Sequence, residues 1–225
     1  MHHTKYTPPT LTVDSVIFQL VENDLCVLLI QRTNNPFKGS WALPGGYCAA
    51  GETTQDAMQR ILMAKASFNT KNLSLIEQLY TFDTVARDPR GHAVSVTYMG
   101  IGKNLYLEDE QSAQNPQFFP VTNLPELAYD HKEIITYAHQ RLQSKLTYTN
   151  AAFALLHEKF TLTQLQSTYE AVIGRELDKR NFRKKFLSLD LINDTGETFR
   201  EGAHRPAKLY SFNKQSLESL SRSFD

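Results

Sequence analysis

One segment of the chain combines a glycine-marked turn with charged side chains of the kind that act on phosphates. It runs from Gly45 to Phe68, with Glu52 just after the turn and Arg60 in the helical stretch that follows. A carboxylate can bind a hard cation such as Mg²⁺, and an arginine can donate paired hydrogen bonds to a phosphate. A single carboxylate is a poor metal site, so the segment indicates phosphate chemistry without an evident means of holding the metal.

The same segment resembles the Nudix box, G-x5-E-x7-R-E-U-x-E-E-x-G-U, where U is apolar. Counted from Gly46, the spacing reaches Glu52 and Arg60, and the preceding WALPGG is also similar to Nudix proteins. In that family the later glutamates hold Mg²⁺, which polarises the diphosphate and helps to activate water. This chain has other residues at those positions, namely Ile61, Ala64 and Lys65. We therefore expect no catalytic residue, no metal site, no obligate Mg²⁺ and no efficient hydrolysis.

The elements around this segment predict one α+β domain. Apolar patterning and turn residues indicate strands at 13–20, 25–31, 73–82, 93–102 and 117–120, and helices at 53–66 and 131–143. Strands followed by one helix mid-way and one helix at the end are typical of an α+β domain. The resemblance to Nudix proteins implies more specifically an α/β/α sandwich.

The pattern becomes helical after Lys145. Apolar side chains at helical spacing predict three short helices, the first of which carries Phe153, Leu155 and Leu156, and two extended segments around a glycine-containing turn follow. Three short helices and a β-hairpin indicate a winged helix-turn-helix. We expect a domain at 1–148 that binds an effector and a DNA-binding domain at 149–225.

The third predicted helix, DKRNFRKKF, is strongly basic. Phe182 and Phe186 lie four residues apart and are expected to face the core, while Asp178 can cap the helix start. Arginine can pair with guanine and asparagine with adenine in the major groove, and cations on a wing contact phosphates or the minor groove. The expected DNA-binding residues are Lys179, Arg180, Asn181, Arg183, Lys184, Arg200, His204 and Arg205. The simpler alternative is a solvated basic helix beside an exposed hairpin.

Two further stretches hold candidate ligand-binding residues. Arg87, Asp88 and Arg90 belong to a turn between two predicted strands, and guanidinium groups beside a cleft suit phosphates. Asp130 and His131 stand where a helix is expected to begin. The alternatives are a solvated hairpin tip for the first group and a helix cap followed by a polar first-turn residue for the second.

These stretches together resemble the ADP-ribose pyrophosphatase branch of Nudix proteins and, more closely, the Nudix-related regulators of bacterial NAD metabolism, the NrtR-like family. The resemblance spans nearly the whole chain, including DHKEI, LDKRNFRKK and HRPAKLY. It implies an effector domain that binds ADP-ribose or a related nucleotide and controls a DNA-binding domain. The residues expected to line the ligand site are Arg32, Trp41, Pro44, Gly45, Gly46, Glu52, Arg60, Tyr80, Arg87, Asp88, Arg90, Asp130 and His131.

Our sequence-based hypothesis is that the protein is a transcriptional regulator, a repressor of NAD metabolism genes. We expect it to bind a palindromic operator as a homodimer, because one recognition helix covers only a half-site. Three alternatives stay open. The first is a weak ADP-ribose pyrophosphatase that uses Glu52 with Glu77 or Asp83. The second is a regulator of the same group that responds to a sugar such as arabinose, and the third is an adaptor whose C-terminal domain binds protein.

Composition adds mainly exclusions. The 24 basic residues balance 24 acidic ones, so the net charge points to no partner. The two cysteines, Cys26 and Cys48, have neither disulfide nor zinc spacing. No apolar run approaches the roughly 20 residues of a membrane span, and the N-terminal sequence shows no signal peptide. We therefore expect a cytoplasmic protein without a membrane partner.

Overall fold

The computed structural model describes residues 7–109, 113–200 and 206–220. Its larger part is built on a mixed sheet of seven strands in the order β3-β2-β1-β6-β5, with β4 paired to β1 and β7 to β2. Strands β1 and β6 run parallel, and the other pairs are antiparallel. The strands are β1 (Thr10–Val21), β2 (Asp24–Gln31), β3 (Trp41–Ala42), β4 (Gly45–Tyr47), β5 (Leu75–Phe82), β6 (Ala93–Ile101) and β7 (Gln117–Pro120).

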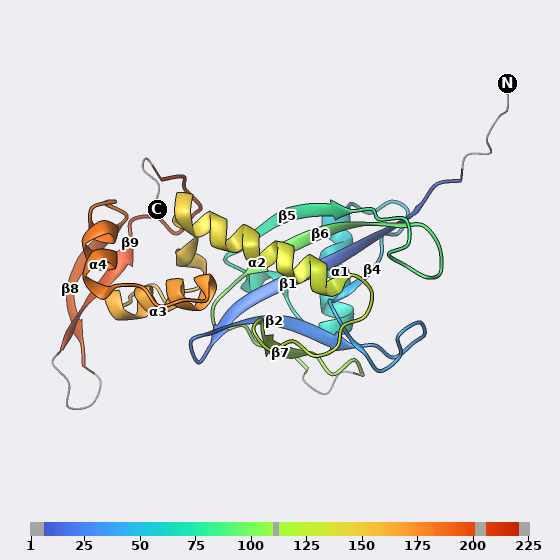
Figure 1. Ribbon diagram of the computed structural model, residues 1–225, viewed down its shortest axis with the longest axis horizontal. Helices are drawn as coiled ribbons and strands as arrows, with labels where there is room; N and C mark the ends of the chain where they lie inside the picture. Colours follow the sequence, from blue (N-terminus) through green and yellow to red (C-terminus); the bar gives the residue numbers. More distant parts are fainter. Residues whose placement is uncertain (1–6, 110–112, 201–205, 221–225) are drawn as a thin grey trace, which may run out of the picture.

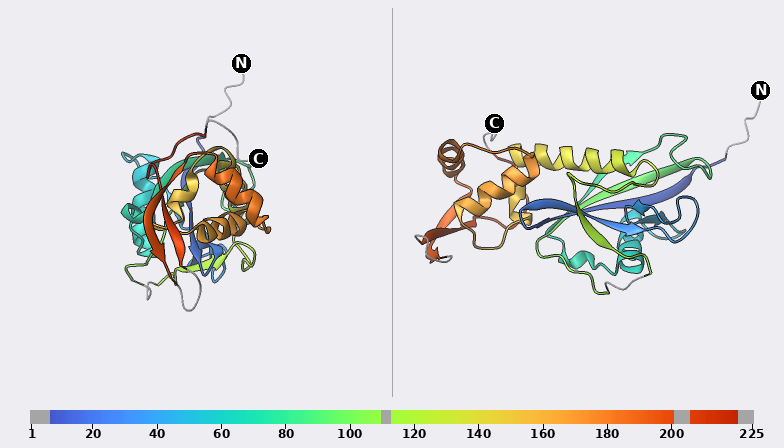
Figure 2. Two further views of the ribbon diagram at one scale, coloured as in Figure 1. Left: turned by 90° about the vertical axis from the view of Figure 1, so that its left-hand side faces the viewer. Right: turned by 60° about the horizontal axis from the view of Figure 1, so that its bottom comes forward.

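One helix covers each face of this sheet. Val16 and Phe18 of β1 belong to the cluster of buried residues that includes α2 (His131–Tyr148), whereas Ile17 belongs to the cluster that includes α1 (Thr54–Ala66). Successive side chains of a strand point to opposite faces, so β1 serves both clusters. Figure 2 shows α1 and α2 on opposite sides of the strands. The predicted α/β/α sandwich is confirmed.

The start and end of α1 follow from its sequence. Thr53 caps the helix and forms a reciprocal capping box with Asp56, and Ser67 ends it in the left-handed conformation at φ 48°. Buried Ala57, Met58, Ile61 and Leu62 anchor one side of α1 against the sheet. These contacts fix how the last turn of α1 approaches β4, the short strand that contains Gly45 and Gly46.

The C-terminal part is a small unit of short helices and a two-stranded sheet at the opposite end of the molecule from the ligand-domain N-terminus (Figure 1). It contains η2 (Ala151–Ala154), α3 (Leu162–Ile173), α4 (Lys179–Leu187), β8 (Ile192–Phe199) and β9 (Ala207–Phe212). Thr161 and Asp178 cap α3 and α4, and Gly174 ends α3 with φ 76°. The predicted winged helix-turn-helix is confirmed, with β8 and β9 as the hairpin of the wing.

Two expectations about the junction were wrong. The first of the three short helices is only a single 3-10 turn, because residues 151–156 are buried on every side and serve as a packed connector. Helix α2 extends to Tyr148, beyond the expected end at residue 143. The extra turn is held by Leu146, which is fully buried, and by Lys145, whose ammonium pairs with Glu77 at 2.7 Å.

Helix α2 joins the two parts (Figure 1). Its His139 Nε2 lies 2.6 Å from the carbonyl oxygen of Val172 at the end of α3, and the Gln143 side chain donates to the same oxygen at 3.0 Å. One cluster of buried residues runs from the sheet through α2 to Tyr169 and Phe186 of the winged helix. The two parts therefore share a core. None of the helices in the described residues combines the length and apolar character needed to cross a bilayer.

Candidate functional site

A cavity of about 390 Å³ opens beside the Gly45–Phe68 segment. Strands β1, β2 and β4, the last turns of α1 and the loops that precede α2 form its walls. The predicted ligand residues that line it are Arg32, Gly45, Gly46, Arg60, Arg87, Asp88, Arg90 and His131. A volume of this size suits a small organic ligand.

The other predicted ligand residues lie outside the cavity lining. The Trp41 ring packs on Phe119 with centroids 4.6 Å apart, and the carbonyl of Pro44 accepts from the Ser15 amide at 2.9 Å. Tyr80 packs on Tyr137 of α2, away from the cavity. The remaining two, Glu52 and Asp130, hold cavity arginines in place by ion pairs. Glu52 and Asp130 thus support the site without lining it.

Arg87 forms the most buried ion-pair network of the cavity wall. Its guanidinium donates two hydrogen bonds of 2.8 Å to Asp130 and one of 3.2 Å to Asp14, and only 5% of its side chain is exposed. Burial opposes the charge, but the two carboxylates outweigh burial and raise the pKa of Arg87. The network thereby ties the loop after β5 to the start of α2 and to the middle of β1.

Asp88 and Arg90 form the turn that was predicted from the sequence. The Asp88 carboxylate accepts from the Arg90 amide at 2.9 Å and pairs with the Arg90 guanidinium at 2.6 Å. Arg90 also donates to the hydroxyl of Tyr47 at 2.9 Å, and its hydrogen bond to Asp88 is the first cause of the lowered pKa of that carboxyl. The guanidinium is thus held at the rim of the cavity.

His131 is the first residue of α2, and it is buried and lines the cavity. Its Nδ1 accepts a 2.8 Å hydrogen bond from the Leu43 amide, and its Nε2 lies 3.7 Å from Asp14. Burial lowers the pKa of His131. The neighbouring Asp130 makes no side-chain cap bond, because both of its oxygens bind Arg87. The start of α2 is therefore tied to the cavity instead of being capped.

Sequence reasoning missed Tyr129, Tyr47 and Asp14 as cavity residues. Tyr129 has a left-handed backbone at φ 54°, the Arg32 guanidinium lies 4.8 Å from the centre of its ring, and its buried hydroxyl has no protein partner. Non-glycine residues in strained backbone conformations cluster at active sites and ligand clamps, although ordinary turns also hold them. A signal existed for Asp14, which interrupts an otherwise apolar strand. Tyr129 adjoins the Asp130–His131 pair but gives no pattern of its own.

The donor set of the cavity does not fit Mg²⁺. The Glu52 carboxylate pairs with Arg60 and accepts from the Ala49 amide at 2.6 Å, and the arginine lowers the pKa of Glu52 to about 2. Ile61 and Lys65 line the cavity at box positions where Nudix hydrolases have carboxylates. Within residues 7–109, 113–200 and 206–220, no three His, Cys, Asp or Glu side chains gather as a metal site needs.

The alternative carboxylates of a weak hydrolase do not complete such a set. Glu77 binds Lys145 at 2.7 Å beneath α2, and neither Glu77 nor Asp83 lines the cavity. The charged groups that do line it are predominantly cationic: Arg32, Arg60, Lys65, Arg87 and Arg90 against Asp14 and Asp88. A cavity of this charge favours an anionic ligand.

The basic helix α4 presents a different kind of surface. Phe182 and Phe186 are buried in the core, as expected. The Asp178 side chain accepts from the Asn181 amide at 2.8 Å and fixes the N-terminal turn. The predicted DNA-binding residues that are exposed on α4 are Lys179, Arg180, Asn181 and Lys184. This end of a recognition helix is the one that enters a major groove.

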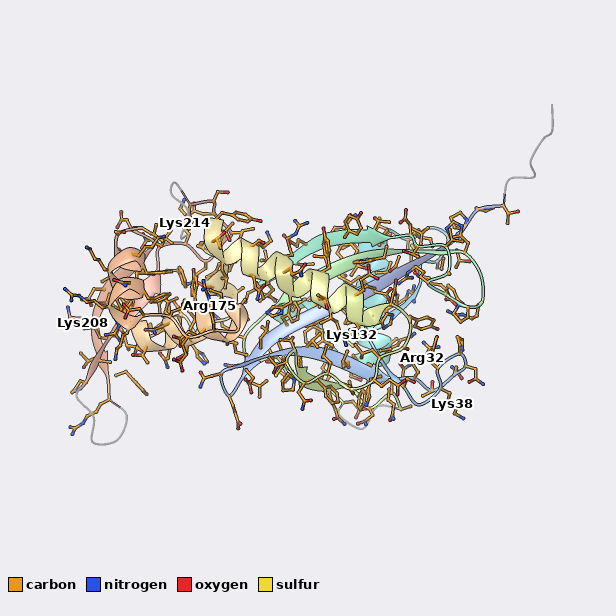
Figure 3. All side chains as sticks on the ribbon, viewed as in Figure 1. Arg32, Lys38, Lys132, Arg175, Lys208 and Lys214 are labelled. Atoms are coloured by element: carbon orange, nitrogen blue, oxygen red, sulfur yellow. The ribbon has the colours of Figure 1, made fainter. Side chains whose placement is uncertain are left out.

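The remaining predicted DNA contacts lie in three settings. Arg183 is half-buried and donates to the Thr163 hydroxyl of α3 at 3.0 Å, so it braces the two helices. Arg200 is exposed at the end of β8, whereas His204 and Arg205 lie outside the described residues. In Figure 3, Lys208 of the wing and Arg32 of the cavity lie at opposite ends of the molecule. The structure thus separates a ligand cavity from a basic surface.

The fold and the two surfaces define a Nudix domain joined to a DNA-binding winged helix. Residues 9–138 match the NUDIX domain, and residues 152–212 match the NrtR DNA-binding winged helix domain. The chain belongs to the NrtR family of Nudix-related transcriptional regulators.

Similar proteins agree with this assignment over most of the chain. The ADPR responsive transcriptional repressor NtrR of Acinetobacter baylyi is 34% identical over 95% of this chain and 86% of its own length. Shewanella oneidensis NrtR, crystallised with a 27mer DNA, is 32% identical and superimposes with a TM-score of 0.78 over 96% of this chain and 99% of that one. Its NUDIX domain complexed with ADP ribose is 31% identical, with a TM-score of 0.55 over 63% and 94% of the two chains.

The Nudix domain also resembles an enzyme. An ADP-ribose pyrophosphatase of Methanocaldococcus jannaschii is 41% identical over 58% of this chain and 73% of its own length. The likeness to the regulators extends through the winged helix, whereas the likeness to this enzyme covers 132 residues. The regulator and the enzyme thus share the domain that carries the cavity.

Proposed function

We propose that this protein is a transcriptional repressor of NAD metabolism genes, that it acts in the cytoplasm, and that it responds to ADP-ribose or a related nucleotide. The observation that carries the proposal is one core linking two sites: a cationic cavity at one end and an exposed basic helix, α4, at the other. The ADPR-responsive Acinetobacter repressor and the Shewanella structures with DNA and with ADP ribose support both halves.

The cavity suits the diphosphate of such an effector. Arg32 and Arg90 flank Tyr129, whose buried hydroxyl can donate to or accept from a bound ligand. A guanidinium group can donate two parallel hydrogen bonds to phosphate oxygens. It is also weakly hydrated, so little hydration is lost when it binds. The predominance of cations favours a phosphorylated effector over a neutral sugar such as arabinose.

The DNA-binding part is expected to act as a homodimer. A single recognition helix covers one half-site, so a two-fold symmetric pair reads a palindrome with half-sites about one helical turn apart. The Asp178 cap presents Arg180 and Asn181 at the end of α4 that meets base edges. This arrangement favours DNA over the alternative of a protein partner for the C-terminal domain.

Efficient hydrolysis of the effector is not part of the proposed function. The pyrophosphatase of Methanocaldococcus jannaschii gives the enzymatic alternative its support. Against that alternative stand Ile61 and Lys65 in the cavity wall and the engagement of Glu52 by Arg60. Magnesium-dependent release of AMP from ADP-ribose at high protein concentration is the result that would favour the enzyme.

Helix α2 is the proposed connection between effector and DNA. Its N-terminal end touches the cavity network through His131 and the preceding Asp130. A later turn of α2 is hydrogen-bonded to the end of α3 through His139 and Gln143. An effector can change DNA affinity only if it binds one arrangement of the two parts better than another. A shift of α2 against α3 would change the spacing of two recognition helices in a dimer.

The proposal is tested by selecting random DNA duplexes on the purified full chain, with and without ADP-ribose, and sequencing what is retained. We expect one enriched palindrome whose recovery changes when ADP-ribose is added. Folded protein that enriches no sequence in either condition would contradict a DNA-binding regulator. Enrichment that is identical in the two conditions would contradict ADP-ribose as the effector.

A further inference from the structure

We propose that the Lys65 ammonium takes the place of the divalent cation of a Nudix hydrolase, so that this chain binds the diphosphate of its effector without any metal ion. The inference rests on the proposed function and adds to it how the same cavity holds its ligand. It makes Lys65 the residue that turns a metal-dependent site into a metal-independent one.

The geometry places this ammonium in the cavity. Lys65 belongs to the last turn of α1, its Nζ donates to the carbonyl oxygen of Gly45 at 2.5 Å, and its side chain is part of the cavity wall. A methyl group built on Gly46 would lie 3.6 Å from the same Nζ. The ammonium therefore lies where α1 ends against the glycine strand β4.

A cation at this position favours the binding of an anion. The C-terminal end of a helix carries partial negative charge, which repels anions and attracts cations. Nudix hydrolases meet that need with a metal held by carboxylates. In this chain Ile61 contributes only apolar surface, Ala64 has no donor atom, and Lys65 brings a fixed positive charge on the helix itself.

The charges around Lys65 disfavour the binding of a divalent cation. Arg32, Arg60 and Arg90 lie around the same cavity, and the charge of Asp14 opposes theirs at Lys65. Burial, and then the charge of Arg32, lower the pKa of Lys65, so its own charge is already opposed. A diphosphate offsets both effects, whereas a second cation would strengthen the repulsion.

The experiment measures ADP-ribose binding to the full chain by calorimetry, in excess EDTA and in Mg²⁺. We expect wild-type dissociation constants that agree within about twofold, and a loss of about ten- to a hundredfold for Lys65→Met in both buffers, as for a charged hydrogen bond. Lys65→Arg should retain most of the affinity, because it keeps the charge. Lys71→Met, a change of an exposed lysine outside the cavity, is the matched control and should bind as the wild type does.

A reversal variant sharpens the test. Ala64→Glu combined with Lys65→Glu restores two of the three missing carboxylates of the box. We expect weak binding in EDTA that recovers on addition of Mg²⁺. Thermal unfolding of each variant shows that it is folded. If Lys65→Met does not fold, Lys65→Gln is measured in its place, since it removes the charge but keeps a polar side chain.

The outcomes separate this inference from the proposed function. Wild-type binding that requires Mg²⁺, or full affinity in the Lys65→Met or Lys65→Gln variant, would overturn the role of Lys65 and leave an ADP-ribose sensor standing. An Ala64→Glu, Lys65→Glu variant that binds as tightly as the wild type in EDTA would also overturn it. Absence of ADP-ribose binding by folded wild-type protein in both buffers would remove the proposed effector and the inference together.

Discussion

The ligand cavity and the recognition helix are both rich in cations, but they hold them in opposite ways. In the cavity, Arg87 is bound by Asp130 and Asp14, and Arg90 by Asp88, before any ligand arrives. On α4, Lys179, Arg180 and Lys184 are exposed. A preorganised site loses little freedom when it binds a small ligand. An exposed cationic surface instead gains from the release of counterions along DNA.

The comparison indicates which changes affect folding and which affect binding. Removal of a buried, paired charge leaves its partners without compensation, whereas removal of an exposed charge leaves the fold intact. The predictions below follow that division, from the largest expected effect to the smallest.

Arg87→Met should cause the largest loss of stability. The substitution leaves the buried Asp14 and the half-buried Asp130 without their cation, and breaking such a network costs about 3–5 kcal/mol. The free energy of unfolding from urea denaturation measures the loss. The matched control is Arg60→Met. Arg60 pairs with Glu52 through an exposed guanidinium, so the loss of unfolding free energy should be far smaller. Equal losses of unfolding free energy from the two substitutions would contradict the distinction between buried, paired cations and exposed cations.

Charge reversal on α4 should remove DNA binding and spare the fold. Arg180→Glu with Lys184→Glu places two negative charges where base edges and phosphates are expected, so affinity for the selected duplex should fall by at least about a hundredfold. Fluorescence anisotropy at fixed salt measures the change. The control, Lys38→Glu, reverses an exposed charge at the other end of the molecule (Figure 3). A double variant with wild-type DNA affinity would exclude α4 as the recognition helix.

Substitution at the contact between α2 and α3 should weaken the coupling between ADP-ribose and DNA binding more than it weakens either binding affinity. His139→Ala with Gln143→Ala removes the hydrogen bonds to Val172, while both binding surfaces remain. We expect near-normal affinity for ADP-ribose alone and for DNA alone, with the effect of one on the other reduced by roughly fivefold or more, within the usual range of coupling energies. An unchanged ligand effect in the double variant would exclude this contact as the path of coupling.

The smallest effect concerns the exposed pair of Glu52 and Arg60. The folded pKa of Glu52 is about 2 against an ordinary value of 4.5, because the Arg60 hydrogen bond favours the carboxylate. A lowered folded pKa means that the pair's contribution to stability is present above pH 4.5 and is lost as the pH falls through about 2. An NMR titration of the Glu52 carboxyl should give a midpoint near 2 in the wild type and a higher midpoint in Arg60→Met. That second midpoint should stay below the ordinary value, because the Ala49 amide still donates to the carboxylate. Identical midpoints in the two proteins would rule out the pair as the cause.

Most of the fold could be predicted from the sequence, because apolar spacing and caps act locally. The 2-residue period of the strands, the Thr53 cap of α1 and the Phe182–Phe186 pair of α4 each appear in a few neighbouring residues. The junction could not be predicted in the same way. The apolar spacing of residues 151–156 predicts an amphipathic helix, yet tertiary packing buries every side of that segment.

The candidate site was predictable only where residues carry their own signal. The glycine turn, Arg87 and Arg90 stand out in the sequence, and they line the cavity. Trp41 and Tyr80 do not line it, because neighbours distant in sequence, Phe119 and Tyr137, determine where their rings pack. Tyr129 was missed for the complementary reason: its role depends on a left-handed backbone and on two arginines from other loops.

The most direct test of the central claim is the affinity of the full chain for its selected duplex, measured with and without saturating ADP-ribose in the presence of EDTA. The account predicts a change of at least about fivefold, since a cavity that is coupled to the winged helix must alter DNA affinity by its coupling free energy. ADP-ribose that binds to the protein but leaves the affinity for DNA unchanged would contradict an account in which the cavity controls the recognition helix.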